Sequence, residues 1–139
     1  MTPGAIVPGV TAQEVCEPGY AKKTRHVSEA VKQSVFEASG LEGNHTGYCA
    51  GGCEIDHLIS LELGGSNDPA NLWPEPYTGT EWNAHVKDRL ENRLHALVCN
   101  GQISLEEAQT AIRSNWIEAW QKYVGDAPIG ARPASLRRD

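Results

Sequence analysis

The chain has 139 residues and a formal net charge of -6, with 40% hydrophobic and 22% charged residues. This length fits one domain with a single core. The acidic balance argues against a protein that wraps nucleic acid by charge alone, but it leaves room for an enzyme that needs only a few phosphate contacts. No stretch reaches the ~20 apolar residues of a membrane span, and residues 1–15 lack the pattern of a signal peptide, so we expect no membrane partner.

The chain opens with residues 1–15, where two prolines and two glycines interrupt any period, and we expect an extended arm there. Apolar residues at helical spacing then predict a helix over residues 28–39, with Ser28 as its N-cap and Gly40 as its stop. Residues 40–53 contain several glycines and indicate loop and turn.

Two extended segments follow. Residues 58–63 alternate apolar and polar side chains, which predicts a half-buried strand that ends at Gly64–Gly65. Residues 71–77 form a second short extended segment, and the prolines within it exclude a central position in a sheet. The two segments together predict a hairpin.

Two helices complete the pattern. Apolar residues at helical spacing predict a helix of about four turns that ends at Asn100–Gly101. Ser104 and Glu107 form a capping box that opens a C-terminal helix over residues 104–124, whose aromatic stripe is typical of a core face. We expect the remaining tail, residues 125–139, to be flexible.

The chain has four cysteines, Cys16, Cys49, Cys53 and Cys99. The Ala-Gly-Gly sequence between Cys49 and Cys53 is typical of a tight turn that brings two sulfurs within bridging range. We expect either two disulfides, 49 to 53 and 16 to 99, which favour an extracytoplasmic protein, or buried free thiols, which favour a cytoplasmic or phage-encoded one. A zinc site with His45 is the least favoured alternative, because paired CxxC units are absent.

Asp56 and His57 stand side by side at the head of the apolar run. In a regular strand they would project to opposite faces, so a site that uses both requires the strand to begin or bulge there. Taken alone, the pair is explained by a turn-capping aspartate and a half-buried histidine. Three features favour chemistry instead: the Gly64–Gly65 reversal, the following Asn71, and a helix with acidic and histidine residues on one side.

The stretches DHLISLELGGSNDPANLWP, which starts at Asp56, and KDRLENRLH, which ends at His95, resemble bacterial HNH endonucleases of the His-Me finger (ββα-metal) superfamily. The resemblance covers roughly residues 53–124. It implies an α+β fold in a single HNH nuclease-like domain, in which residues 53–98 form the ββα-metal hairpin and helix and additional helices pack against them. We expect this domain to be a monomer.

The resemblance implies a divalent-metal-dependent DNA endonuclease that leaves 5'-phosphate and 3'-hydroxyl ends. His57 would be the general base for water, a task that suits an imidazole with a reference pKa of about 6.5. Asp56 would hold a metal ion, which acts as a Lewis acid and charge clamp. Asn71 would hold the hairpin loop and help to fix the His57 ring.

The remaining metal ligands are expected on the helix. Glu91 and His95 lie one helical turn apart on one face, and we choose them as ligands. A different interpretation makes Glu91 a surface contact of Lys87 or His95. His85 and Asn83 in the first turn are competing ligands, since the usual third residue of the family motif is histidine or asparagine.

Carboxylates with an imidazole suit Mg²⁺ or Mn²⁺, while His95 leaves Zn²⁺ or Ni²⁺ open. We expect double-stranded DNA, and also single-stranded DNA, as the partner, with no small-molecule cofactor. Lys87 and Arg89 would grip flanking phosphates, although such charges more often form a solvated helix face. The alternative function is a non-catalytic module in which the finger survives as a scaffold that binds protein or nucleic acid.

Overall fold

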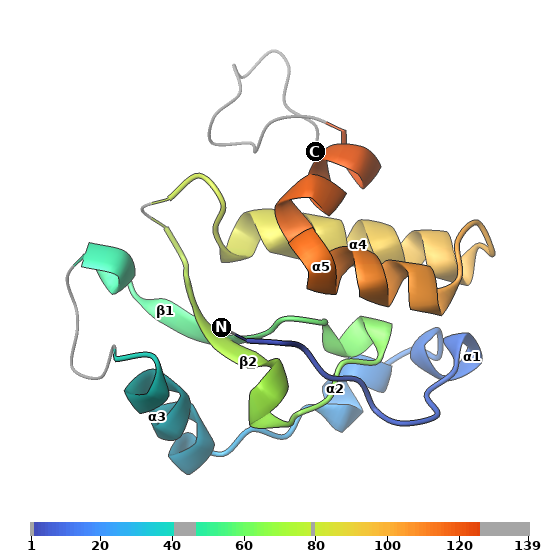
Figure 1. Cartoon of the computed structure of the whole chain (residues 1–139). Coiled ribbons are helices and arrows are strands. Elements are labelled where there is room, and N and C mark those ends of the chain that lie inside the picture. Colours follow the sequence, from blue (N-terminus) through green and yellow to red (C-terminus); the bar gives the residue numbers. More distant parts are fainter. Residues whose placement is uncertain (1, 41–46, 79, 126–139) are drawn as a thin grey trace.

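The computed structural model describes residues 2–40, 47–78 and 80–125, so His45 and nearly all of the predicted tail lie outside the described residues. The chain mixes helices with one antiparallel two-stranded sheet, in agreement with the α+β prediction (Figure 1). The regular elements, in chain order, are α1 (Ala12–Val15), α2 (Tyr20–Thr24), α3 (Glu29–Ala38), β1 (Cys53–His57), β2 (Leu72–Pro76), α4 (Ala84–Cys99) and α5 (Leu105–Tyr123). Three short 3-10 turns join them: η1 (Gly47–Cys49), η2 (Leu61–Leu63) and η3 (Pro69–Asn71).

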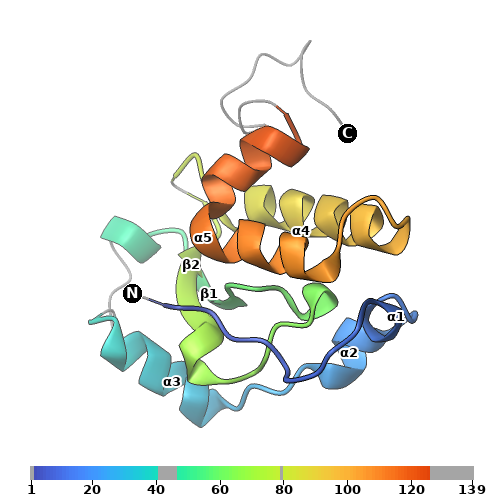
Figure 2. The same cartoon turned by 45° about the vertical axis from the view of Figure 1, so that its right-hand side comes forward.

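The sheet is a hairpin in which Asp56 pairs with Trp73 and His57 pairs with Leu72. Both strands of a two-stranded sheet are edges, which is why β2 tolerates its prolines. The prediction of a second extended segment is therefore confirmed. Helices α4 and α5 lie side by side on one side of the hairpin and its loop, and α1 to α3 lie on the other (Figures 1 and 2).

The predicted strand over residues 58–63 is wrong. The strand lies earlier, at Cys53–His57, and Leu61–Leu63 forms the turn η2, which ends at Gly64 with a left-handed φ of 85°. The apolar side chains of this stretch are buried because helices on several sides contact η2, and Ser60 is buried with them. The backbone N–H and C=O of Ile59 bond to the side chain of Asn71 instead of to a neighbouring strand.

The four-turn helix is confirmed as α4, which carries Asn83 as its N-cap and ends at the C-cap Asn100. Its apolar stripe, with Leu90 and Leu94 fully buried, packs on α5 to form the main core. Among the described helices, none is both long enough and apolar enough to cross a membrane.

The N-caps of the other two predicted helices are also confirmed, but only the Ser104 half of the predicted capping box is, because Glu107 Oε2 accepts a hydrogen bond from the Tyr123 hydroxyl instead. The Ser28 side chain accepts a hydrogen bond from the Val31 N–H at the start of α3, and Ser104 accepts one from Glu107 at the start of α5. Helix α5 contains a break that the sequence analysis did not predict. Asn115 has non-helical backbone angles there.

The predicted extended arm over residues 1–15 is wrong at its end. Its first part does run extended along the hairpin loop, where Gly4 N–H donates to the Ala70 carbonyl and Val7 N–H to the Gly64 carbonyl. The chain then turns into α1, which a reciprocal Thr11–Glu14 capping box opens. Helices as short as α1 and α2 show no hydrophobic period, so they were missed.

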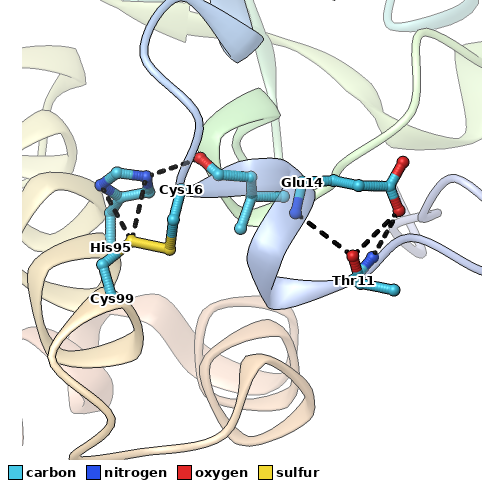
Figure 3. The surroundings of a disulfide bond; sticks show 6 residues. Thr11, Glu14, Cys16, His95 and Cys99 are labelled. Atoms are coloured by element: carbon cyan, nitrogen blue, oxygen red, sulfur yellow. Dashed lines mark hydrogen bonds between the residues drawn. A yellow bond between two sulfur atoms is a disulfide. The ribbon is translucent and has the colours of Figure 1, made fainter.

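The structure forms both disulfides of the first alternative, Cys16–Cys99 and Cys49–Cys53, and the described residues include no free cysteine. Cys16–Cys99 joins the end of α1 to the end of α4 (Figure 3). Buried free thiols are therefore excluded, and so is a zinc site made of these sulfurs.

We expect the Cys16→Ser/Cys99→Ser variant to lose more stability than the Cys49→Ser/Cys53→Ser variant. The first bond spans a sequence separation of 83 and the second a separation of 4. Loop-closure entropy then gives losses of about 4.5 and about 2 kcal/mol in the free energy of unfolding. Urea denaturation of the two variants measures both losses, and equal losses would contradict this account.

Candidate active site

Three carboxylates gather on one face of the hairpin. Glu54 and Asp56 are two residues apart on β1 and so share a face, and Glu75 on β2 is the register partner of Glu54. One oxygen from each of the three lies within 4.8 Å of the others. Glu75 is fully buried, and neither of its carboxylate oxygens has a hydrogen-bond partner among the described residues.

Several carboxyl groups lie close together on this face. Burial, reinforced by the charge of Asp56, raises the pKa of Glu75 to about 9. Burial and the charge of Asp56 also raise the pKa values of Glu54 and of Asp88, which comes from α4. The crowded, buried face therefore disfavours ionisation of these carboxyl groups, and most strongly that of Glu75.

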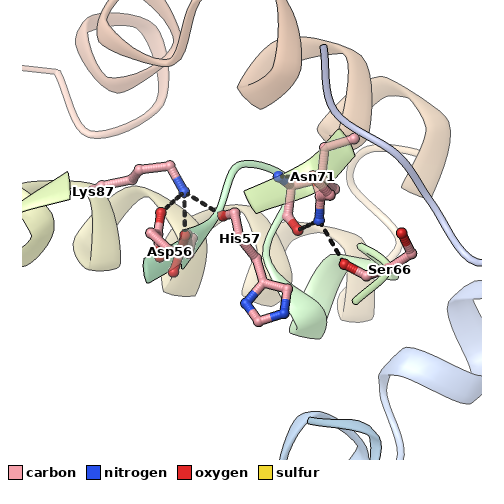
Figure 4. Close-up of polar contacts among 7 residues, drawn as sticks. Asp56, His57, Ser66, Asn71 and Lys87 are labelled. Carbon is pink, nitrogen blue, oxygen red and sulfur yellow. Dashed lines mark hydrogen bonds and ion pairs between the residues drawn. The ribbon is translucent and has the colours of Figure 1, made fainter. Parts of the chain in front are cut away.

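Lys87 brings the one cation that lies inside this face, as far as the chain is described. Its side chain is fully buried, with Nζ 2.8 Å from Asp56 Oδ2, 2.6 Å from Glu91 Oε2 and 3.0 Å from the His57 carbonyl oxygen (Figure 4). Burial acts to lower the pKa of Lys87, but the charges of Glu91, Asp56 and Glu75 more than offset this and raise it. The ammonium thus stays charged and ties β1 to α4.

This burial corrects two predictions. Lys87 does not grip a flanking phosphate from the surface, because no part of its side chain is exposed. The contact between Glu91 and Lys87 exists, but it is a buried pair instead of a surface pair. The role of Arg89, which is part-exposed on the same helix, stays a prediction.

His57 is the last residue of β1, and its ring projects away from the ion pair of Lys87 and Asp56 (Figure 4). The ring Nε2 lies 3.0 Å from Asn67 Oδ1, and the Asn67 amide donates to the Thr24 carbonyl. Since the Asn67 oxygen must accept, Nε2 carries the proton and Nδ1 keeps the free lone pair. Burial lowers the pKa of His57, partly opposed by this hydrogen bond, and so favours the neutral ring.

Asn71 is fully buried and forms four hydrogen bonds. Its Oδ1 accepts from the N–H groups of Ala5 and Ile59, and its Nδ2 donates to the carbonyls of Ile59 and Ser66 (Figure 4). A Cβ atom at Gly65 would lie only 1.7 Å from the Ile59 carbonyl oxygen, so only glycine fits beside this network. Asn71 therefore holds the hairpin loop, as the resemblance implied.

The prediction that Asn71 also fixes the His57 ring is wrong. That contact comes from Asn67, four residues earlier, in the turn sequence Ser-Asn-Asp. The sequence carries no signal for this contact, because an asparagine in a turn has the same local pattern whether it caps the turn or hydrogen-bonds to a distant ring.

The prediction that His95 is a metal ligand beside Asp56 is also wrong. His95 lies next to the Cys16–Cys99 disulfide, with Nε2 2.9 Å from the Val15 carbonyl oxygen (Figure 3). This carbonyl, at the end of α1, takes the hydrogen bond of the ring. The two sulfurs near His95 are bonded to each other and do not offer a metal site.

The competing ligands occupy other positions. Asn83 is the N-cap of α4, where its Oδ1 accepts from the N–H groups of His85 and Val86. His85 is exposed in the first turn, with its ring centre 6.3 Å from that of Tyr77. Neither residue belongs to the carboxylate group of the hairpin.

A polar pocket of about 200 Å³ opens between the acidic face and His57. Asp56, His57 and Glu91 line it together with Arg25, Glu54 and others. A larger apolar cavity of about 650 Å³ lies by Trp73 and the break in α5, and none of the predicted site residues lines it. Of the predicted site residues, Asp56, His57 and Glu91 therefore line the smaller pocket.

Comparisons with protein-family models, with curated proteins and with solved structures give no match. The resemblance to HNH endonucleases rests on the motif residues themselves.

We expect Glu75→Gln to make the protein more stable at pH 8 but not at pH 5. The pKa of Glu75 is raised in the folded protein, so its burial favours folding below the ordinary value near 4.5 and opposes it increasingly as pH rises toward about 9. Glutamine does not ionise, and we expect a gain of about 2 kcal/mol at pH 8. Urea denaturation in EDTA measures it, with the exposed Glu118→Gln as control. Equal pH dependence of parent and Glu75→Gln would contradict this.

We expect Lys87→Met to destabilise the protein in EDTA and millimolar Mn²⁺ to restore part of the loss. The change leaves Asp56, Glu75 and Glu91 without the ammonium that lies among them, at a cost of about 3–5 kcal/mol. Thermal unfolding with and without Mn²⁺ measures both effects. The exposed Lys122→Met is the matched control and should show neither. A Lys87→Met protein that is as stable as the parent, or whose thermal stability does not change with Mn²⁺, would contradict this.

Proposed function

We propose that this chain is a divalent-metal-dependent DNA endonuclease of the HNH, ββα-metal kind. The observation that carries the proposal is that Asp56 and His57 line one polar pocket, at the point where β1 ends and faces α4. The order of hairpin, buried asparagine and helix supports it as well.

The carboxylates of Glu54, Asp56 and Glu75 suit a cation that takes oxygen ligands, such as Mg²⁺ or Mn²⁺. The buried, unpartnered oxygens of Glu75 support this fit, because a cation would satisfy them. When bound, a divalent cation neutralises phosphate charge and stabilises the leaving oxygen. His95 lies away from this set, so its imidazole gives no support to Zn²⁺ or Ni²⁺ there, while Glu91, which lines the same pocket, stays a predicted ligand.

His57 suits the role of general base. Its burial favours the neutral imidazole, and Asn67 fixes the tautomer so that Nδ1 takes the proton of the attacking water. Asn71 holds the loop that orients the end of β1. The resemblance implies that the products carry 5'-phosphate and 3'-hydroxyl ends.

Lys87 acts as a positioning residue in this proposal. It pairs with one oxygen of Asp56 and one of Glu91, so the remaining Oδ1 of Asp56 has no ion pair among the described residues. The pairing fixes the rotamer of Asp56 while leaving one ligand atom to the pocket.

One observation favours the second candidate, a non-catalytic scaffold that binds protein or nucleic acid. The ammonium of Lys87 already lies among Asp56, Glu91 and the His57 carbonyl, as a built-in cation would. In such a scaffold the hairpin and α4 are held together without any metal ion.

Nicking of supercoiled plasmid in Mg²⁺, Mn²⁺ or EDTA separates the two candidates. We expect metal-dependent nicking that His57→Ala reduces by about 100-fold to 10,000-fold, the usual contribution of a general base. His85→Ala is the matched control, since it removes an exposed histidine of α4, and it should nick like the parent.

The absence of metal-dependent nicking, or a His57→Ala protein that nicks like the parent, would overturn the endonuclease proposal and favour the scaffold. A loss of nicking in His85→Ala would instead indicate that a metal ligand lies in the first turn of α4.

A further inference from the structure

A second pocket, of about 300 Å³, adjoins the acidic pocket and shares Arg25, Glu54 and His57 with it. Its other walls differ in character from the acidic face. They include Lys32 and Phe36 from α3 and Tyr77, which follows β2. The cleft around His57 thus has an acidic half and a half that is basic and aromatic.

The basic half belongs to the most basic surface segment that the structure describes. Residues 22–32 carry four of the 12 lysines and arginines, with Glu29 as their single acidic residue. Among the described residues, no carboxylate lies within 4.0 Å of the Arg25 guanidinium. Lys32 pairs with Glu29 at 3.3 Å, but the Glu29 side chain is 91% exposed, and such surface pairs are easily exchanged. Both cations are available to a phosphate.

The aromatic side chains complete the pocket. Phe36 is half-buried, and Tyr77 is 38% exposed, so both side chains leave ring surface accessible. A groove that combines cations with aromatic rings is the arrangement by which proteins hold single-stranded nucleic acid. A pocket of about 300 Å³ is large enough for one nucleoside but not for a base pair.

We propose that this second pocket holds one unpaired nucleotide of the substrate strand, with its phosphate on Arg25 and Lys32 and its base against Phe36 and Tyr77. Arg25 lines both pockets, so it is placed to hold the phosphate that passes from one to the other beside His57. A base inside a duplex is stacked and paired and does not enter such a pocket. The preferred substrate is therefore single-stranded at the cleavage point, an inference that rests on the proposed endonuclease function.

Fluorescence anisotropy of the full chain tests this, using a labelled 12-nucleotide DNA and its duplex in EDTA, where metal-dependent cleavage does not occur. We expect the single strand to bind on the order of 10-fold more tightly than the duplex. Arg25→Ala/Lys32→Ala should weaken single-strand binding at least 10-fold and make it less dependent on salt. Tyr77→Ala should weaken single-strand binding on the order of 10-fold and leave duplex binding unchanged.

Lys122→Ala is the control for charge, since Lys122 is exposed on α5 and lines neither pocket of the cleft. Thermal unfolding verifies that each variant is folded, and Tyr77→Ala removes an exposed side chain, so it tests the pocket even where another variant is unstable. Equal binding of single strand and duplex, or a double variant that binds like Lys122→Ala, would overturn the inference.

The binding and nicking experiments can overturn the nucleotide pocket and the endonuclease proposal independently of each other. If the parent nicks DNA in a metal-dependent way but binding does not depend on Arg25, Lys32 and Tyr77, the pocket assignment is wrong and the endonuclease proposal stands. If binding depends on these residues but no nicking occurs, the nucleotide pocket stands and the endonuclease proposal is wrong.

Discussion

The buried ammonium of Lys87 joins the hairpin to α4 and explains why the candidate site has its shape. An unpaired charge inside a protein costs several kcal/mol, so Lys87 is stable there only while Asp56 and Glu91 remain beside it. The same contact reaches the carbonyl oxygen of His57. One cation thereby fixes the register of α4 against the end of β1, where the proposed chemistry lies.

A second constraint comes from Asn71, which replaces the missing strand partner of the hairpin loop. Its hydrogen bonds to Ile59 allow the apolar stretch after His57 to leave the sheet and enter the core. Because β1 ends at His57, Asp56 faces α4 while the ring of His57 reaches Asn67. The adjacent pair can therefore line one pocket without a bulge in the strand.

Local signals in the sequence predicted much of this fold. Ser28 and Ser104 are N-cap residues that mark where two helices begin, and the short turn between Cys49 and Cys53 indicates their disulfide. Other local patterns fit more than one structure, and the surrounding elements decide which one forms. The alternation over residues 58–63 is typical of a half-exposed strand, yet here Leu61–Leu63 folds into η2, which packs against several helices, and Ser60 is buried as well.

The candidate site likewise contains residues that the sequence predicted and contacts that it could not predict. Asp56, His57 and Asn71 were identified through a motif that is short in sequence. Helical spacing placed Glu91 and His95 on one face, but it could not tell that His95 meets the end of α1, because that contact spans most of the chain. The burial of Lys87 was equally hidden, since lysines are almost never fully buried unless paired.

The position of a bound cation tests most directly whether the carboxylates of the hairpin form a metal site. Crystals soaked in Mn²⁺ and measured at a wavelength where manganese scatters anomalously locate the ion without reference to activity. We expect an anomalous peak at coordination distance from carboxylate oxygens of Asp56 and of Glu54 or Glu75, and none beside His95. A peak at His85 or His95, or no peak at saturating Mn²⁺ while Lys87 keeps its place, would contradict it.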